Sequence, residues 1–180
     1  MAGPASPEDG TGDPATQRIE SALTDEPVWL AKAGAQIQHM YRYWRGKARD
    51  GRLPRRADID PADIPRLLSH LMIVEVVDDA RRYVYRLVGT KEVEMRGRDP
   101  TGLSVIDGFL GPSLEDALSM YDGTVRLRTP QYDDKPYVST NGRWVSDETL
   151  FLPLSDDGAR INRILVFAAT EPYRKPTRRP

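Results

Sequence analysis

The stretch MIVEVVDDARRYVYRLVGT, residues 72–90, contains two apolar runs separated by a polar segment. The first run covers residues 72–77. In the second, residues 83–88, larger apolar side chains occupy every other position. A period of two is typical of β-strands, and a polar connection of this length suits a tight reversal. This stretch therefore predicts an antiparallel hairpin.

The last third of the chain repeats this kind of pattern. Residues 137–139 and 143–145 flank Asn141-Gly142, a dipeptide suited to the positive φ angles of a tight hairpin turn. Residues 149–154 and 161–169 flank the polar stretch 155–158, which ends in glycine. We expect these segments to add further antiparallel strands to the same sheet.

Helical patterns precede and interrupt these strands. Residues 35–49 carry an apolar stripe at helical spacing, and a short helix is predicted where Asp60 can cap and Pro61 can begin it. A helical turn is expected from Thr90 to Gly97, and a longer helix begins at Ser113. Antiparallel strands with helices packed on them predict an α+β fold.

The two ends of the chain have the composition of disordered segments. Residues 1–27 are expected to be mostly disordered, because their first half is dominated by proline, glycine and polar residues. Residues 171–180 form a basic, proline-rich tail that we expect to be mobile. The predicted domain spans residues 28–170.

Composition excludes several classes of protein. The 180 residues include no cysteine, so disulfides, cysteine nucleophiles, cysteine-ligated zinc and cysteinyl-flavin adducts are excluded. No apolar run approaches the roughly 20 residues that span a bilayer, and the first residues do not form a secretory signal. The expected location is cytoplasmic. The charges, 26 basic and 27 acidic, almost balance.

Five short motifs occur in an order that resembles one family. They are Tyr43-Trp44, LPRRADIDP at 53–61, YRLVGT at 85–90, GRDPTG at 97–102 and LPLSDDG at 152–158. In this order they are similar to a bacterial, mainly alphaproteobacterial, family of stand-alone PAS-like domains. The resemblance implies a five-stranded antiparallel sheet with helices on one face and an N-terminal amphipathic flanking helix. It also implies a non-enzymatic sensory or protein-interaction module that acts in trans on a signalling partner.

The resemblance further implies that any small ligand lies between the sheet and the helices. Candidate pocket residues are the large or charged side chains of the strands and helices concerned: Tyr85, Arg86, Met95, Met120, Tyr121, Trp144 and Phe151. Arg86, in mid-strand, is expected either to form an ion pair, for instance with Asp99, or to anchor a ligand carboxylate or phosphate. Residues assigned to turns and motif positions are Gly89, Thr90, Gly97, Asp99, Gly102 and Pro153.

Catalytic chemistry finds little support in the sequence. The two histidines, His39 on a polar helix face and His70 before the first strand, have no ligand setting, and no serine elbow, zinc or phosphate-loop motif is present. We predict no catalytic residue, no metal site and no cofactor, although an unidentified small ligand is compatible with the fold.

Two surfaces remain for partners. The stripe Ile37, Met40, Tyr41 and Trp44 predicts a homodimer interface, with docking onto the chain's own domain as the alternative. The basic stretch 42–56 contains seven basic residues and one acid. It is expected to be a solvated surface, and a regulated nucleic-acid binder or an uncharacterised enzyme using this stretch is the alternative function.

Overall fold

One antiparallel sheet forms the centre of the domain. The computed structural model describes residues 14–138 and 144–172. The strands are β1 (Leu71–Val76), β2 (Tyr83–Val88), β3 (Gln131–Asp133), β4 (Tyr137–Val138), β5 (Trp144–Leu154) and β6 (Arg163–Pro172). Their order is β2-β1-β6-β5-β3, and the short β4 pairs with β5 beyond β3. Strands β3 and β4 both pair with β5 and together form the fifth position of the sheet. The predicted α+β fold with a five-stranded antiparallel sheet is therefore confirmed.

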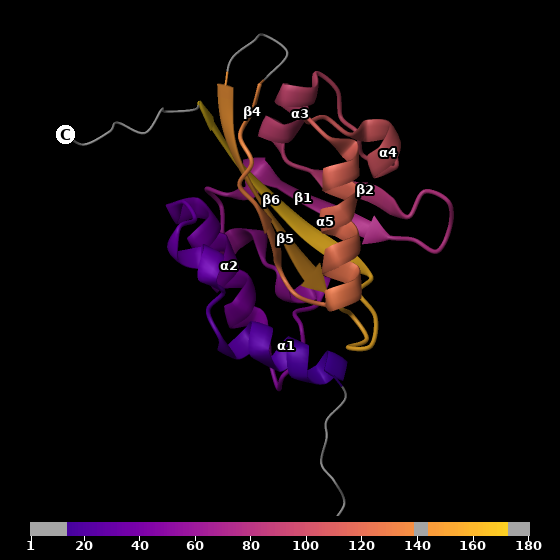
Figure 1. The fold of residues 1–180 in the computed structure, drawn as a ribbon. Coiled ribbons are helices and arrows are strands. Elements are labelled where there is room, and N and C mark those ends of the chain that lie inside the picture. The colour runs from indigo at the N-terminus through magenta and orange to yellow at the C-terminus, as the bar shows by residue number, and fades with distance from the viewer. Residues whose placement is uncertain (1–13, 139–143, 173–180) are drawn as a thin grey trace, which may run out of the picture.

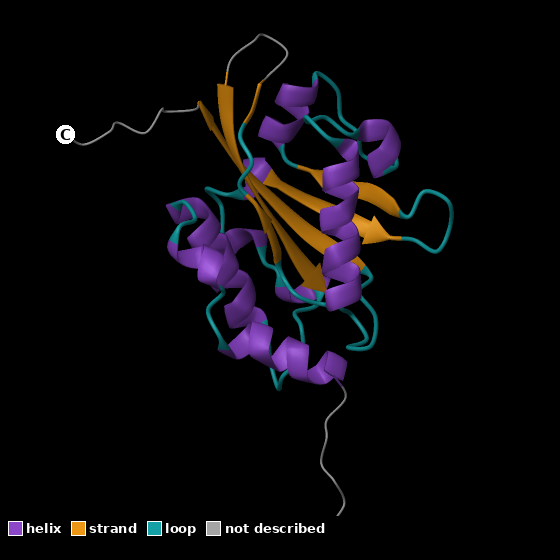
Figure 2. Ribbon diagram, viewed as in Figure 1, coloured by secondary structure: helices purple, strands orange, loops and turns teal. Residues whose placement is uncertain are grey.

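Helices cover both faces of this sheet. They are α1 (Pro14–Thr24), α2 (Ala35–Lys47), α3 (Thr90–Arg96), α4 (Val105–Gly108) and α5 (Leu114–Leu127). Single turns of 3-10 helix occur at Val28–Ala31, Arg56–Asp58, Pro61–Asp63 and Leu68–His70. Figures 1 and 2 show α3, α4 and α5 on one side of the strands and α1 and α2 on the other. The flanking helix therefore packs opposite the main helical layer.

Strand β5 supplies side chains to both layers. Side chains alternate between the faces of a strand, so Glu148 and Leu150 lie on one face and Thr149 and Phe151 on the other. The Glu148 carboxylate accepts hydrogen bonds from the Gly34 amide at 2.9 and 3.1 Å, which identifies its side as the α2 face. Phe151 contacts Tyr121 of α5 edge-on, which identifies the α5 face.

The apolar stripe of α2 is buried against this chain's own sheet. Ile37, Met40, Tyr41 and Trp44 are between 0% and 1% exposed, and the Trp44 Nε1–H donates to the Pro153 carbonyl at 3.0 Å. The stripe is therefore the docking surface within the chain that the sequence analysis held as the alternative. Its assignment as a dimer interface is corrected, because these side chains have no surface left to offer a second copy.

Trp44→Phe tests this docking. The substitution keeps an aromatic ring but removes the indole N–H, so the Pro153 carbonyl loses its donor and a small void forms. We expect the free energy of unfolding to fall by about 1–2 kcal/mol, measured by urea denaturation. His39→Ala, on the exposed side of the same helix, is the control and should change stability by less than about 0.5 kcal/mol. Equal losses in the two variants would contradict the docking.

Most of the predicted helix boundaries are present. The Asp60 carboxylate accepts from the Ala62 amide at 2.9 Å, and the Ser113 hydroxyl accepts from the Asp116 amide at 3.0 Å. Gly97 ends α3 in the left-handed conformation, with φ of 67°. Thr90 was wrong as a cap, because Gly89 occupies that position and Thr90 is already helical.

Two elements were not expected from the sequence. Helix α1 lies inside the segment predicted to be mostly disordered, and its Ile19 is 7% exposed and joins the core. Strand β3 was not predicted because its three residues include two polar side chains. Strand β6 also continues past residue 170 to Pro172. The Asn141-Gly142 turn and residues 173–180 lie outside the described residues.

Candidate functional site

A cavity lies between the α5 face of the sheet and the helices that cover it. Its volume is about 110 Å³. Helix α3, the loop at residues 109–112 and helix α5 form one wall, with residues from the β3 region and from β5 at its edge. The sheet wall is formed by side chains from four strands, Met72, Tyr85, Thr149, Phe151, Val166 and Ala168. The site is thus the internal space that the topology places between strands and helices.

Aromatic rings form part of the cavity wall. The Tyr121 ring meets Phe151 edge-on, with centroids 5.0 Å apart, and stacks on Tyr83 at 4.9 Å. Tyr121 is only 3% exposed, and burial raises the pKa of its phenol well above 10. This part of the wall therefore presents neutral, apolar ring surface.

A buried ion pair also lines the cavity. Glu92 and Arg96, one turn apart on α3, both line the cavity, and their side chains are 2% and 7% exposed. The Arg96 Nη1–H donates to Glu92 Oε2 at 2.7 Å. The guanidinium also lies over the Tyr85 ring, 5.8 Å from its centroid, and Nη2 lies 3.7 Å from the Met72 sulfur. Charged groups this deep are rare unless they are paired.

The pair is not fully satisfied. Within the described residues, Glu92 Oε1 and Arg96 Nε are buried and have no hydrogen-bond partner. Burial raises the pKa of the Glu92 carboxyl, and the Arg96 hydrogen bond opposes that change. For Arg96 burial acts to lower the pKa, but the hydrogen bond to Glu92 outweighs it and the net pKa is raised, so the guanidinium stays charged. A buried acceptor and a buried donor are left beside the cavity.

The predicted pocket residues divide into three groups. The structure brings four of the seven together at the cavity wall: Tyr85, Met95, Tyr121 and Phe151. Met120 is partly buried and packs against the core, but it is not among the lining residues. The side chain of Trp144 lies outside what the structure describes. A binding role for any of these residues stays a prediction.

Arg86 lies outside the cavity, which corrects its assignment as a pocket residue. The pairing of β1 with β2 steps from Ile73↔Leu87 to Val74↔Tyr85, so Arg86 is the extra residue of a β-bulge. Its half-exposed side chain pairs with Glu75 on the neighbouring strand. The suggested partner Asp99 instead accepts from the Thr101 amide at 2.9 Å and helps close a turn.

The buried ion pair was missed by the sequence analysis, and four further charged residues also line the cavity: Asp116, Asp133, Lys135 and Asp147. Glu92 and Arg96 have the i, i+4 spacing of a helical ion pair, which was visible in the sequence. That spacing is typical of solvated helix faces, so it carries no sign of burial. Only the packing of α3 over the sheet places the pair inside.

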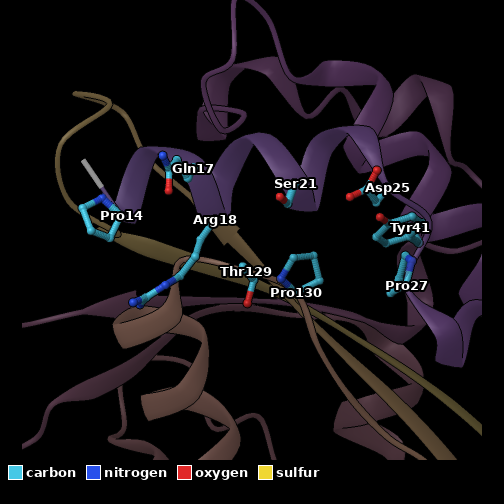
Figure 3. Close-up of a pocket in the computed structure, with 9 residues that line it drawn as sticks. All are labelled: Pro14, Gln17, Arg18, Ser21, Asp25, Pro27, Tyr41, Thr129 and Pro130. Atoms are coloured by element: carbon cyan, nitrogen blue, oxygen red, sulfur yellow. The ribbon is translucent and has the colours of Figure 1, made fainter. Parts of the chain in front are cut away.

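A larger hollow lies along α1, but it lacks these features. Its volume is about 490 Å³, and it separates α1 from Thr129 and Pro130, as Figure 3 shows. Tyr41 forms one end, and the other lining residues that Figure 3 labels come from α1 and its flanks. Neither of the charged residues that line it, Arg18 and Asp25, is buried. We therefore place the candidate site at the smaller cavity.

The basic stretch 42–56 is largely paired with acids. Lys47 contacts Asp63 at 2.7 Å and Arg55 contacts Asp58 at 2.8 Å. Arg42 and Arg45 both lie within 4 Å of Glu26, at 3.8 and 3.9 Å. These contacts favour the predicted solvated surface over a nucleic-acid interface.

Comparison with protein families identifies the class of domain. Residues 33–167 match the model of a PAS domain, and the chain belongs to this family. PAS domains are generally sensory, non-enzymatic modules that often dimerise and signal to partners. Comparison with the curated proteins gave no match. Within the described residues, no helix is both long enough and apolar enough to cross a membrane.

Solved structures of light-sensing domains are similar in outline. The LOV domain from the Erythrobacter litoralis EL346 blue-light activated histidine kinase is 12% identical, with a TM-score of 0.44 over 57% of this chain and 95% of that one. A Rhodobacter sphaeroides LOV protein is 11% identical, with a TM-score of 0.43 over 61% and 66%. At this distance nothing about light sensing follows for this chain.

Proposed function

We propose that this PAS domain is a non-enzymatic sensor that binds a small ligand in the cavity between its sheet and α3 and α5. The observation that supports this proposal best is the Glu92–Arg96 pair, buried at the cavity wall with one donor and one acceptor unmatched. Burying such groups costs free energy unless they find partners, and a ligand in the adjacent cavity would supply them.

The output of this sensor would reach a signalling protein in trans. A homodimer, a cytoplasmic location and an origin in the alphaproteobacterial stand-alone branch belong to the same proposal. The frequent dimerisation of PAS domains supports the first, and the other two remain expectations from the sequence. The pairing of the basic stretch gives the nucleic-acid alternative no specific support.

Native mass spectrometry tests the proposal directly. We expect protein purified from cell extract to carry a small additional mass in part of the population. The variant Ala117→Leu, which adds bulk at the cavity wall, should lose that mass. Ala57→Leu, at an exposed position, should retain it. A folded wild-type protein that neither retains a mass from extract nor binds any small molecule at the cavity would contradict the proposal.

A further inference from the structure

We propose that the cavity selects small protonated amines over neutral or anionic compounds of similar size. This inference rests on the proposed function and narrows it to a class of ligand. It draws on three observations: the charge of the residues that line the cavity, a buried carboxylate oxygen that has no hydrogen-bond partner, and the size and aromatic character of the wall.

The lining of the cavity carries an excess of negative charge. The two tyrosines in the wall add no charge, because burial raises the pKa of both phenols. A cation would partly neutralise the excess, whereas an anion would add to it. Among the described residues, the charged side chains of the lining are four carboxylates and two cations, namely Glu92, Asp116, Asp133 and Asp147 against Arg96 and Lys135.

Two of these acids lie near each other on the sheet. Asp133 of β3 is directly opposite Thr149 of β5, and Asp147 precedes Thr149 by two residues on the same face. All three residues line the cavity. Diagonal neighbours on adjacent strands are about 7–8 Å apart, so one small ligand can lie close to both carboxylates. The sheet wall therefore contributes two negative charges at one place.

Glu92 supplies a buried hydrogen-bond acceptor. Its side chain is 2% exposed, Oε2 accepts from Arg96 at 2.7 Å, and Oε1 has no partner among the described residues. Burial is the main cause of the raised pKa of the Glu92 carboxyl, and the charge of Asp147 adds to it. An ammonium group only donates, and its hydrogen bonds to carboxylates are strengthened by charge. The free oxygen therefore calls for a donor, and the acids around the cavity favour a cationic one.

An organic cation suits this cavity better than a metal ion. Within the part of the chain that the structure describes, no three histidine, aspartate or glutamate side chains are placed to hold a metal. The wall instead includes four aromatic rings, whose faces attract ammonium groups. A dry cavity of about 150 Å³ holds benzene, so about 110 Å³ suits an amine of roughly four or five heavy atoms. The rings belong to Tyr85, Phe109, Tyr121 and Phe151.

The compound 2-aminoethanol is a suitable probe of this size. Its amine is protonated at pH 7, as the lysine side chain is. Its hydroxyl can accept from Arg96 Nε, which is buried and has no acceptor among the described residues. Ethylene glycol replaces the ammonium group with a second hydroxyl, and glycolate replaces it with a carboxylate. The three compounds therefore differ mainly in charge.

Each compound would be titrated into ¹⁵N-labelled full-length protein and followed by amide chemical shifts. With 2-aminoethanol we expect shifts at Glu92, Arg96 and Thr149, which line the cavity. Ethylene glycol and glycolate should bind at least about tenfold more weakly, because neither brings a charge-assisted donor to the carboxylates.

Asp133→Asn supplies the matched variant. It keeps the size of the side chain and removes one negative charge from the lining, so 2-aminoethanol should bind roughly fivefold more weakly while ethylene glycol is unaffected. Asp134→Asn makes the same change at the next residue, which is exposed and does not line the cavity, and should bind like the wild type. Asp133 is only half-buried, so its variant is expected to fold.

Glu92→Gln tests the buried acceptor. The amide oxygen can still accept from Arg96, but the other position becomes a donor that opposes the ammonium group. We expect a loss of at least about tenfold in affinity for 2-aminoethanol. Glu94→Gln, at an exposed position of α3, should bind like the wild type. The comparison of the three compounds and of Asp133→Asn stands even where Glu92→Gln fails to fold.

The outcomes separate the ligand class from the proposed function. Equal binding of 2-aminoethanol and ethylene glycol, or tighter binding of glycolate, would overturn the class and leave a ligand-binding cavity. Equal affinities of Asp133→Asn and Asp134→Asn for 2-aminoethanol would do the same, as would a chain that binds no probe but retains a mass from extract. Failure of every probe together with the absence of any retained mass would overturn both.

Discussion

Gly89→Val is expected to lower the free energy of unfolding by about 3 kcal/mol. Gly89 joins β2 to α3, and a Cβ there would lie 2.4 Å from the Ser69 carbonyl oxygen and 2.6 Å from that of Leu68. Both contacts are to backbone, which cannot rotate away as a side chain can. The loss comes from lack of space, because φ of −64° suits any residue.

The control for this prediction is a glycine with room around it. Gly46 lies in α2 with nothing within 4 Å of an added Cβ, so Gly46→Ala should stabilise the domain by about 0.5–1 kcal/mol. Gly97→Val should also destabilise, but through its positive φ. Urea denaturation of the three variants measures the differences. An unchanged midpoint for both Gly89→Val and Gly97→Val would contradict the turn assignments.

Glu92→Ala is expected to cost about 3–5 kcal/mol, because it leaves the Arg96 guanidinium buried without its counter-charge. Arg96 is held among Met72, Tyr85 and the sheet and has little path to solvent. Chemical denaturation with circular dichroism measures the loss.

The double variant Glu92→Leu with Arg96→Met tests the cause. Replacing both charges with apolar side chains of similar size removes the uncompensated charge, so most of the lost stability should return. A double variant less stable than Glu92→Ala would show that the charge is not the cause.

The sequence was sufficient to predict those strands and helix ends that depend on neighbouring residues alone. The β1–β2 hairpin, the cap at Ser113 and the end of α3 at Gly97 follow from alternation and from turn chemistry that neighbouring residues provide. Strand β3 has no such local pattern. Its three residues form a strand because they pair with β5, which lies later in the chain. Helix α1 likewise lacks a clear local pattern, although its Ile19 is buried in the core.

The candidate site shows the same division. Aromatic residues such as Tyr121 and Phe151 could be assigned to the interior from type and spacing. The charged residues could not: simple alternation gives Arg86 a regular place in β2, whereas the bulge turns it outward toward Glu75. Arg96 sits on a helix that looks solvated in sequence, and its burial depends on contacts made by distant strands.

The alternation of β5 also limits how this domain can change in length. Glu148 holds the amide of Gly34 on one face, while the next residue, Thr149, borders the cavity on the other. Inserting or deleting one residue within β5 would exchange the side chains that face α2 with those that face the cavity. The Glu148 carboxylate would then point toward the cavity, and its contact to Gly34 would be lost. Length variation among natural variants or designed ones should therefore concentrate in the exposed loop at residues 156–160, where an added residue changes no face assignment.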